Sequence, residues 1–279
     1  MADTKNMAAE TVVEADERKP LLEVKNLRKA FPIKKSLTGK VQQELIAVDN
    51  VSFDLYPGET LGIVGESVCG NTTLGRTILG LVPATSGEVW YNGRNIIECN
   101  KREQRELRKD LQIIFQDPYS SINPRLTVSE IIAEPMIVCG KYQKSEINDR
   151  VTRLMDTVGL ADRLYNAYPH ELDGGRRQRI GVARALSLNP RFIVCDEPVS
   201  ALDVSIQAQI INLLKDLQKE YNLTYLFISH DLSVVYQICD RVAVLYHGEI
   251  VDQGDVDTVY DNPASDYTKR LLEASLALD

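Results

Sequence analysis

The sequence predicts an α/β fold whose core is a mostly parallel sheet, with an antiparallel β part near the N-terminus and an inserted α-helical segment. Three observations support this fold class. Strand-like alternation dominates residues 21–64, amphipathic helical spacing dominates residues 117–172, and buried apolar strands alternate with helices from residue 173 onward. Alternation of the last kind is typical of a parallel sheet covered by helices on both faces.

The N-terminal part is rich in strand signals. Residues 21–31 alternate like a strand, and the polar stretch at residues 34–43 interrupts the pattern. Residues 47–67 then give two more strands, which are separated by a turn at Pro57 and Gly58. The chain is therefore expected to begin with an antiparallel β part.

Helices and strands alternate in much of the remaining chain. A helix is expected at residues 73–81, and a hairpin is expected around Asn92 and Gly93. The expected elements after the helical insertion are a helix at 174–188, a buried strand at 191–198, a helix at 205–221, a buried strand at 224–230 and a hairpin at 240–254.

Composition excludes several classes of protein. The chain has 279 residues, a formal net charge of -8 and a pI near 5.1, whereas nucleic-acid binders carry an excess of Lys and Arg, so nucleic acid is not an expected partner. No run of about 20 apolar residues and no signal peptide is present, which predicts a soluble protein with at most peripheral membrane association. The cysteines lack metal-ligand spacing and are expected to be reduced thiols: Cys69, Cys99, Cys139, Cys195 and Cys239.

A glycine-containing loop joins an apolar strand to a helix and fits the phosphate-binding spacing G-x-x-x-x-G-K-[ST], except that Asn71 replaces the lysine. In such a P-loop, backbone N–H groups and the helix N-terminus bind phosphates, and the hydroxyl of Thr72 reaches Mg2+. Alone, the match fits an ordinary βα turn equally well. The candidate residues are Gly65, Glu66, Ser67, Val68, Cys69, Gly70, Asn71, Thr72 and Thr73.

A pair of carboxylates follows the buried strand at 191–198. Ligands of open α/β sheets bind at the carboxyl ends of the strands, so Asp196 is expected to hold Mg2+ and Glu197 to orient or deprotonate an attacking water. The alternative is an acidic pair that caps a helix. Because the P-loop lies on the same predicted sheet, the phosphoryl-transfer interpretation is favoured.

The segment Leu-Asp-Gly-Gly-Arg at residues 172–176 resembles the ABC-transporter signature L-S-G-G-Q. The other motifs fall in the order that this family requires. Gln116 resembles its Q-loop, residues 200–203, ending at Asp203, resemble its D-loop, and His230 resembles its switch histidine. The chain is therefore similar to a P-loop NTPase with a RecA-like core, and FPIKKSLTGK, QDPYSSINPR and NPASDYTKRLL are most similar to ATPases of oligopeptide and dipeptide importers.

The resemblance implies a role for each matching position. Phe31 would stack on adenine, although a packed core aromatic is the alternative. Gln116 would contact Mg2+ and sense the permease, and His230 would contact the γ-phosphate. The residues that would reach the ATP of a partner subunit are Asp173, Gly174, Gly175, Arg176 and Asp203.

Four positions depart from the family consensus: Val68, Asn71, Asp173 and Arg176. Losing a charged hydrogen bond at Asn71 should cost about 1.5–3 kcal/mol of phosphate binding. Asp173 adds a like charge near phosphate, which pairing with Arg176 could offset. We expect an ATPase with reduced activity, while a catalytically degenerate subunit with a structural or regulatory role is the alternative.

The resemblance also implies an organisation and partners. The expected units are a disordered tail at 1–20, an ATP-binding core at 21–116, a helical subdomain at 117–172, the signature helix with the remaining core at 173–255, and a C-terminal helical tail at 256–279.

Expected cofactors are ATP and Mg2+, with no iron-sulfur cluster. Expected partners are a second, non-identical ATPase subunit, two permease subunits at the cytoplasmic face of the membrane and, indirectly, an extracytoplasmic binding protein. Peptide is the expected cargo, with sugars or metal chelates as alternatives, and a soluble ABC ATPase acting on ribosomes or DNA is disfavoured because no second cassette or coiled coil is present.

Overall fold

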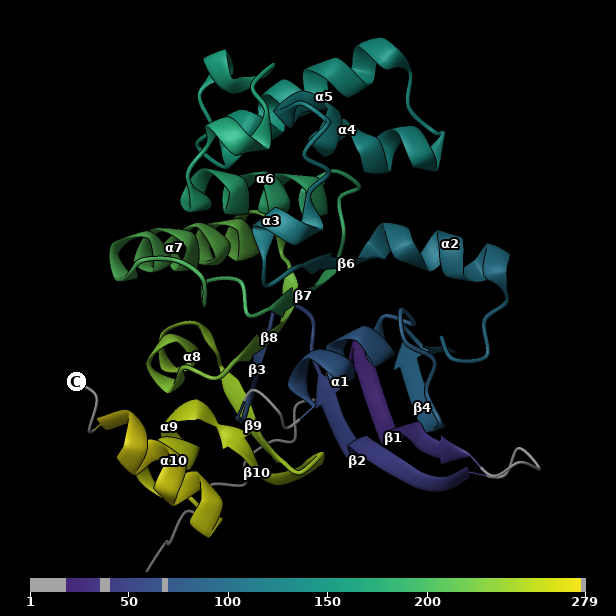
Figure 1. Cartoon of the computed structure of the whole chain (residues 1–279), viewed down its shortest axis with the longest axis vertical. Helices are drawn as coiled ribbons and strands as arrows, with labels where there is room; N and C mark the ends of the chain where they lie inside the picture. The colour runs from purple at the N-terminus through teal and green to yellow at the C-terminus, as the bar shows by residue number, and fades with distance from the viewer. Residues whose placement is uncertain (1–18, 36–40, 67–69, 277–279) are drawn as a thin grey trace, which may run out of the picture.

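The computed structural model describes residues 19–35, 41–66 and 70–276 (Figure 1). Two sheets organise these residues. The antiparallel sheet has the strand order β2-β1-β4-β5, and the larger sheet has the order β10-β9-β3-β8-β7-β6. The larger sheet is parallel except for the β9–β10 hairpin, which confirms the predicted fold class.

The strands of the antiparallel sheet are β1 (Leu22–Lys35), β2 (Val41–Leu55), β4 (Ser86–Tyr91) and β5 (Arg94–Asn95). β1 and β2 form a longer ribbon than expected, because pairing continues through Lys34 opposite Gln43 in the stretch predicted to interrupt it. Polar side chains break the alternation but not the backbone ladder. Asn92 and Gly93 have φ angles of 50° and 77°, which fit the tight turn predicted between β4 and β5.

The strands of the larger sheet are β3 (Thr60–Val64), β6 (Leu111–Ile114), β7 (Phe192–Asp196), β8 (Thr224–Ser229), β9 (Arg241–Tyr246) and β10 (Glu249–Asp255). Every residue of β3, β7 and β8 is buried. Strands buried on both faces need mostly apolar residues, and the polar residues of these three strands lie only at strand ends: Thr60, Asp196, Thr224 and Ser229.

Helix α1 (Asn71–Ile78) lies between the two sheets. Its Leu74 and Ile78 belong to one apolar cluster with Val24 of β1 and Ile63 of β3. The opposite face of the larger sheet carries a second cluster, in which β7 meets α6 (Gly174–Leu186) and the helical insertion. The loop that enters α1 is therefore held by both sheets.

The inserted helices form the upper lobe in Figure 1, and α6 and α7 lie between that lobe and the sheet. The remaining helices are α2 (Lys101–Asp110), α3 (Pro118–Ser121), α4 (Val128–Cys139), α5 (Lys144–Thr157), α7 (Val204–Tyr221), α8 (Leu232–Ile238), α9 (Val256–Asp261) and α10 (Asp266–Leu276), with 3-10 turns η1 (Asp162–Leu164) and η2 (Pro169–Glu171). Within the described ranges, no helix has the length and hydropathy of a membrane span.

Gly87 allows β4 to approach β1. Its φ is 94°, and a Cβ atom there would lie 2.4 Å from the carbonyl oxygen of Asn26. We predict that Gly87→Ala lowers the free energy of unfolding by about 1–3 kcal/mol, because it adds a clash to an unfavourable dihedral. Gly93→Ala is the control, since Gly93 also has a positive φ but has open space around it. Urea unfolding should show a clearly larger loss for Gly87→Ala, and equal losses would contradict the clash.

Candidate functional site

The predicted site residues follow the carboxyl ends of four parallel strands. The P-loop follows β3, Gln116 follows β6, Glu197 follows β7 and His230 follows β8. Register keeps these ends level, since Val64 is opposite Ser229 and Asp196 is opposite Ile228. Side chains far apart in sequence therefore meet at one edge of the sheet.

Thr72 and Asp196 form the first contact across this edge. The Thr72 hydroxyl donates to Asp196 Oδ1 at 2.8 Å, and Arg76 Nη2 lies 3.5 Å from Oδ2. Asp196 is fully buried, and its burial raises the pKa of the carboxyl, against the opposing effects of the Thr72 hydrogen bond and the Arg76 charge. A hydroxyl and a carboxylate side by side are oxygen ligands of the type that Mg2+ prefers.

Glu197 is held by two side chains. Gln116 Nε2 donates to its Oε2 at 2.5 Å, and His230 Nδ1 lies 3.2 Å from Oε1. The backbone of Glu197 is left-handed, with φ at 46°, and its N–H donates to the carbonyl of Ile228 at 2.9 Å. A strained dihedral of this kind in a non-glycine residue is common where a side chain is aimed at a reacting centre.

The described part of the P-loop needs its glycines. A Cβ atom at Gly65 would lie 2.3 Å from the Leu245 carbonyl oxygen, and one at Gly70 would lie 1.9 Å from that of Ala47. Gly70 also has a φ of 97°. Backbone is therefore packed against the loop on both sides. Ser67, Val68 and Cys69 lie outside the described residues, so the departure at Val68 stays untested.

Asn71 turns its amide back onto the loop. The residue is 4% exposed, and Nδ2 donates to the Gly65 carbonyl at 3.0 Å, so the side chain closes the loop across its base. Among the described residues, Oδ1 has no hydrogen-bond donor. An amide in this position brings no positive charge. Thr73 lies in the first turn of α1, where its carbonyl accepts a bond from Thr77.

Phe31 lies on the β1–β2 ribbon, which packs against the P-loop through Ala47. It is opposite Leu45 on β2, two residues from the Ala47 that packs on Gly70. The ring is 37% exposed, and the Lys29 ammonium lies 4.6 Å from its centroid. This exposure differs from that of a packed core aromatic, whereas stacking on adenine stays a prediction.

Two of the signature residues, Asp173 and Arg176, face solvent at the start of α6. Asp173 caps the helix by accepting from the Arg176 N–H at 2.8 Å, and its carboxylate also pairs with the Arg176 guanidinium at 3.2 Å. Asp173 and Arg176 are both exposed, whereas Gly175 is buried. In the part of the chain that the structure describes, no hydrogen bond or ion pair joins these residues, or Asp203 at the start of α7, to Glu197 or Asp196.

Two contacts of the site were missed by sequence reasoning. Arg76 reaches Asp196, and Tyr267 of α10 accepts a hydrogen bond from the Glu66 N–H. Arg76 lies one helical turn after Thr72, so helical spacing could have indicated it. Nothing in the sequence relates Tyr267 to a loop 201 residues away.

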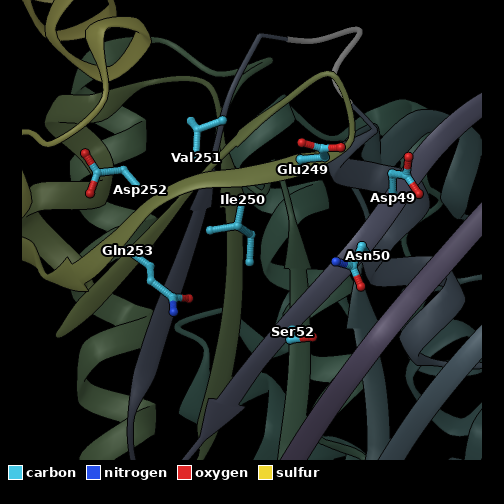
Figure 2. Close-up of a pocket in the computed structure, with 8 residues that line it drawn as sticks. All are labelled: Asp49, Asn50, Ser52, Glu249, Ile250, Val251, Asp252 and Gln253. Atoms are coloured by element: carbon cyan, nitrogen blue, oxygen red, sulfur yellow. The ribbon is translucent and has the colours of Figure 1, made fainter.

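A separate groove of about 540 Å3 runs between β2 and β10 (Figure 2). None of the predicted site residues lines it. Two of its acidic side chains have partners: Asp49 pairs with Arg28 at 3.4 Å, and Asp252 accepts from the Ala264 N–H at 2.8 Å. The groove therefore does not extend the site.

The fold and this arrangement of motifs define the ATP-binding cassette of an ABC transporter. The chain belongs to the ABC transporter family, whose model matches residues 48–200. It is 52% identical to the oligopeptide transport ATP-binding protein OppF of Salmonella typhimurium, covering 93% of this chain and 78% of the relative. OppF of Bacillus subtilis is also 52% identical, with 91% of this chain and 82% of the relative covered.

Two further matches extend the comparison. The glutathione import ATP-binding protein GsiA of Pectobacterium atrosepticum is 49% identical to this chain. The match covers 91% of this chain and 41% of GsiA. The solved dimer of the ATP-binding cassette MJ0796 with ADP and Pi has a TM-score of 0.75 and 28% identity, with 84% of this chain and 98% of that chain covered. These matches confirm the predicted family and ATP hydrolysis as its activity. They give no support to the degenerate alternative.

The burial of Asp196 generates a prediction about stability and pH. A raised pKa means that the folded state disfavours the ionised carboxyl. Burial of Asp196 therefore lowers the free energy of unfolding once the pH rises above 3.8, the ordinary pKa of the group. Asp196→Asn should therefore raise the free energy of unfolding at neutral pH, and its advantage over the wild type should narrow as pH falls toward 3.8.

Urea unfolding of both proteins, measured at intervals of about half a pH unit across pH 4.5–8, would give the difference in their free energies of unfolding. Asp203→Asn serves as the control, because Asp203 is exposed. A variant that is less stable than the wild type at neutral pH would rule out the burial argument.

Proposed function

We propose that the chain is the ATP-hydrolysing subunit of an importer for oligopeptides, and that it works as one half of a head-to-tail dimer with a second ATPase subunit. The observation that carries the proposal is the meeting of Gln116, Glu197 and His230 beside Thr72 and Asp196. The cargo is inferred from the relatives, since the two OppF proteins are matched over 78% and 82% of their length.

The nucleotide would bind along the edge formed by the P-loop. We infer that Phe31 stacks on adenine and that the loop backbone with Thr73 holds the phosphates. Mg2+ would be held by Thr72, Gln116 and Asp196, and it would neutralise charge on the phosphates. The Thr72–Asp196 hydrogen bond supports this set, because it keeps two oxygen ligands together.

Glu197 is proposed to orient or deprotonate the attacking water. The contacts from Gln116 and His230 use one acceptor site on each carboxylate oxygen, so each oxygen keeps a lone pair that can accept a proton or a hydrogen bond from the water. His230 contacts Glu197 through Nδ1, which leaves Nε2 for the γ-phosphate. Gln116 is in contact with the catalytic carboxylate and begins the segment that leads into the helical insertion, so it is suited to sense the permease.

The second half of each nucleotide site is proposed to come from the partner subunit. Asp173, Gly174, Gly175, Arg176 and Asp203 would reach the partner's ATP. The exposure of Asp173 and Arg176, together with the dimeric state of the MJ0796 cassette, supports this arrangement. Because Asp173 is paired with Arg176, the extra carboxylate adds less repulsion toward phosphate than a free one would.

We further propose that the helical subdomain at 117–172 contacts two permease subunits at the cytoplasmic face of the membrane, with a binding protein outside. Tyr119 is exposed, and its ring is backed by the Arg177 guanidinium at 3.6 Å, which fixes α3 to α6. Motion at the signature helix would thus reach the permease-facing surface. The same proposal includes the boundaries between the expected units of the chain, which fall after residues 20, 116, 172 and 255. It also includes the expectation that the subunit carries no iron-sulfur cluster.

Glu197→Gln tests the catalytic assignment. We predict that phosphate release by the assembled transporter falls at least about 100-fold, the usual worth of a general base, while ATP binding is kept. Uptake of an oligopeptide into vesicles should fall with it. Glu98→Gln is the control, since Glu98 is exposed and takes no part in the site. Hydrolysis that survives in Glu197→Gln would refute the role, and wild-type uptake of a sugar in place of peptides would refute the substrate class.

Asn71→Lys tests the effect of the missing ammonium. The dissociation constant for ATP should fall roughly ten- to a hundredfold, because a charged hydrogen bond to phosphate is restored. Asn71→Met is the control, because methionine is about as long as lysine but carries no charge. It should therefore not tighten ATP binding. Fluorescent nucleotide titration would compare the three proteins. Equal affinity of Asn71→Lys and Asn71→Met would show that charge at this position contributes nothing.

A further inference from the structure

The phosphate loop is tied to the C-terminal helix α10. The N–H of Glu66, the second residue of the loop, donates to the phenol oxygen of Tyr267 at 3.3 Å. Tyr267 is 7% exposed. It lies in the segment NPASDYTKRLL, which none of the proposed nucleotide contacts uses. A hydrogen bond of this kind fixes the direction of the first peptide of the loop.

An aromatic stack holds Tyr267 in place. Its ring lies 4.0 Å from that of Tyr246 at an interplanar angle of 29°, and Tyr246 lies 4.1 Å from His247. Tyr246 is the last residue of β9, whose Leu245 carbonyl packs against Gly65. The start of the loop is therefore bounded by β9 on one side and by Tyr267 on another.

The N-terminal end of α10 is itself anchored. The N–H groups of Ala264 and Ser265 donate to the Asp252 carboxylate of β10 at 2.8 and 3.2 Å, and the Tyr267 N–H donates to Ser265 Oγ at 3.2 Å. Backbone and ring are thus both restrained. Because the Tyr267 side chain is already ordered, it loses little further conformational entropy when it forms the hydrogen bond to the loop. A phenol held in this way can restrain the loop.

We propose that Tyr267 is a positioning residue that preorganises the phosphate loop for nucleotide, an inference that rests on the nucleotide site proposed above. Asn71 supplies no ammonium, so phosphate binding depends more on the loop backbone. Fixing the Glu66 peptide reduces the ordering that the backbone must undergo when phosphate binds. The C-terminal helix thereby contributes to nucleotide affinity without touching nucleotide.

Tyr267→Phe tests this proposal, because it removes the phenol oxygen and keeps the stacked ring. In the full chain, the dissociation constant for a fluorescent ATP analogue should rise about three- to tenfold, which is the usual effect of one lost hydrogen bond. In the assembled transporter, the KM for ATP should rise by the same factor while kcat changes less than about twofold, since the contact acts on binding.

Tyr260→Phe is the matched control. Its phenol also bonds to a backbone group near the C-terminus, the Leu232 carbonyl at 2.6 Å, but it does not contact the loop. The two variants should have similar Tm values, and nucleotide affinity should fall in Tyr267→Phe alone. Tyr267→Trp, which keeps a large stacked ring without the phenol, should repeat the result of Tyr267→Phe.

Three outcomes would overturn the proposal. One is unchanged ATP affinity in Tyr267→Phe, and another is an equal loss in Tyr260→Phe. A fall in kcat with no change in KM would also contradict it, because the contact would then act on catalysis. If the wild-type chain binds no ATP at all, the proposed nucleotide site fails and this inference fails with it, whereas binding that is indifferent to Tyr267→Phe refutes only the inference.

Discussion

The hydrogen bond from Thr72 to Asp196 is the contact on which the rest of the site depends. It joins the first turn of α1 to the end of β7, across 124 residues of sequence. The bond is available because the parallel register brings β3 and β7 to a common edge through β8. Burying a carboxylate there is unfavourable, and the Thr72 hydroxyl and Arg76 charge offset part of that cost.

A second constraint is the packing of α1 between two sheets. Its apolar residues share a cluster with β1 on one side and with β3 on the other. The antiparallel part therefore does more than extend the domain, because Ala47 of β2 closes on Gly70 at the entrance to α1. The same ribbon carries Phe31, so one strand pair connects the base-stacking candidate with the P-loop.

Much of the fold could be predicted from sequence, because buried parallel strands such as β7 and β8 are mostly apolar runs. The roles of Gln116 and His230 were implied by the family resemblance, and the level ends of the parallel strands explain why both side chains lie beside Glu197. Helix α2 was not predicted, because none of its residues is buried and hydrophobic periodicity is therefore lacking. The pairing of Asp173 with Arg176 follows from helical spacing, whereas the contact of Tyr267 with Glu66 depends on tertiary packing that no local pattern encodes.

The long sequence separations within the site also bear on synthesis. A chain leaves the ribosome from its N-terminus, so the P-loop emerges well before β7 delivers Asp196 and far ahead of Tyr267. During that interval the loop has neither its acidic neighbour nor its C-terminal anchor. Nascent or truncated chains that lack α10 would then hold ATP poorly, and nucleotide capture would become a late event in the maturation of the subunit.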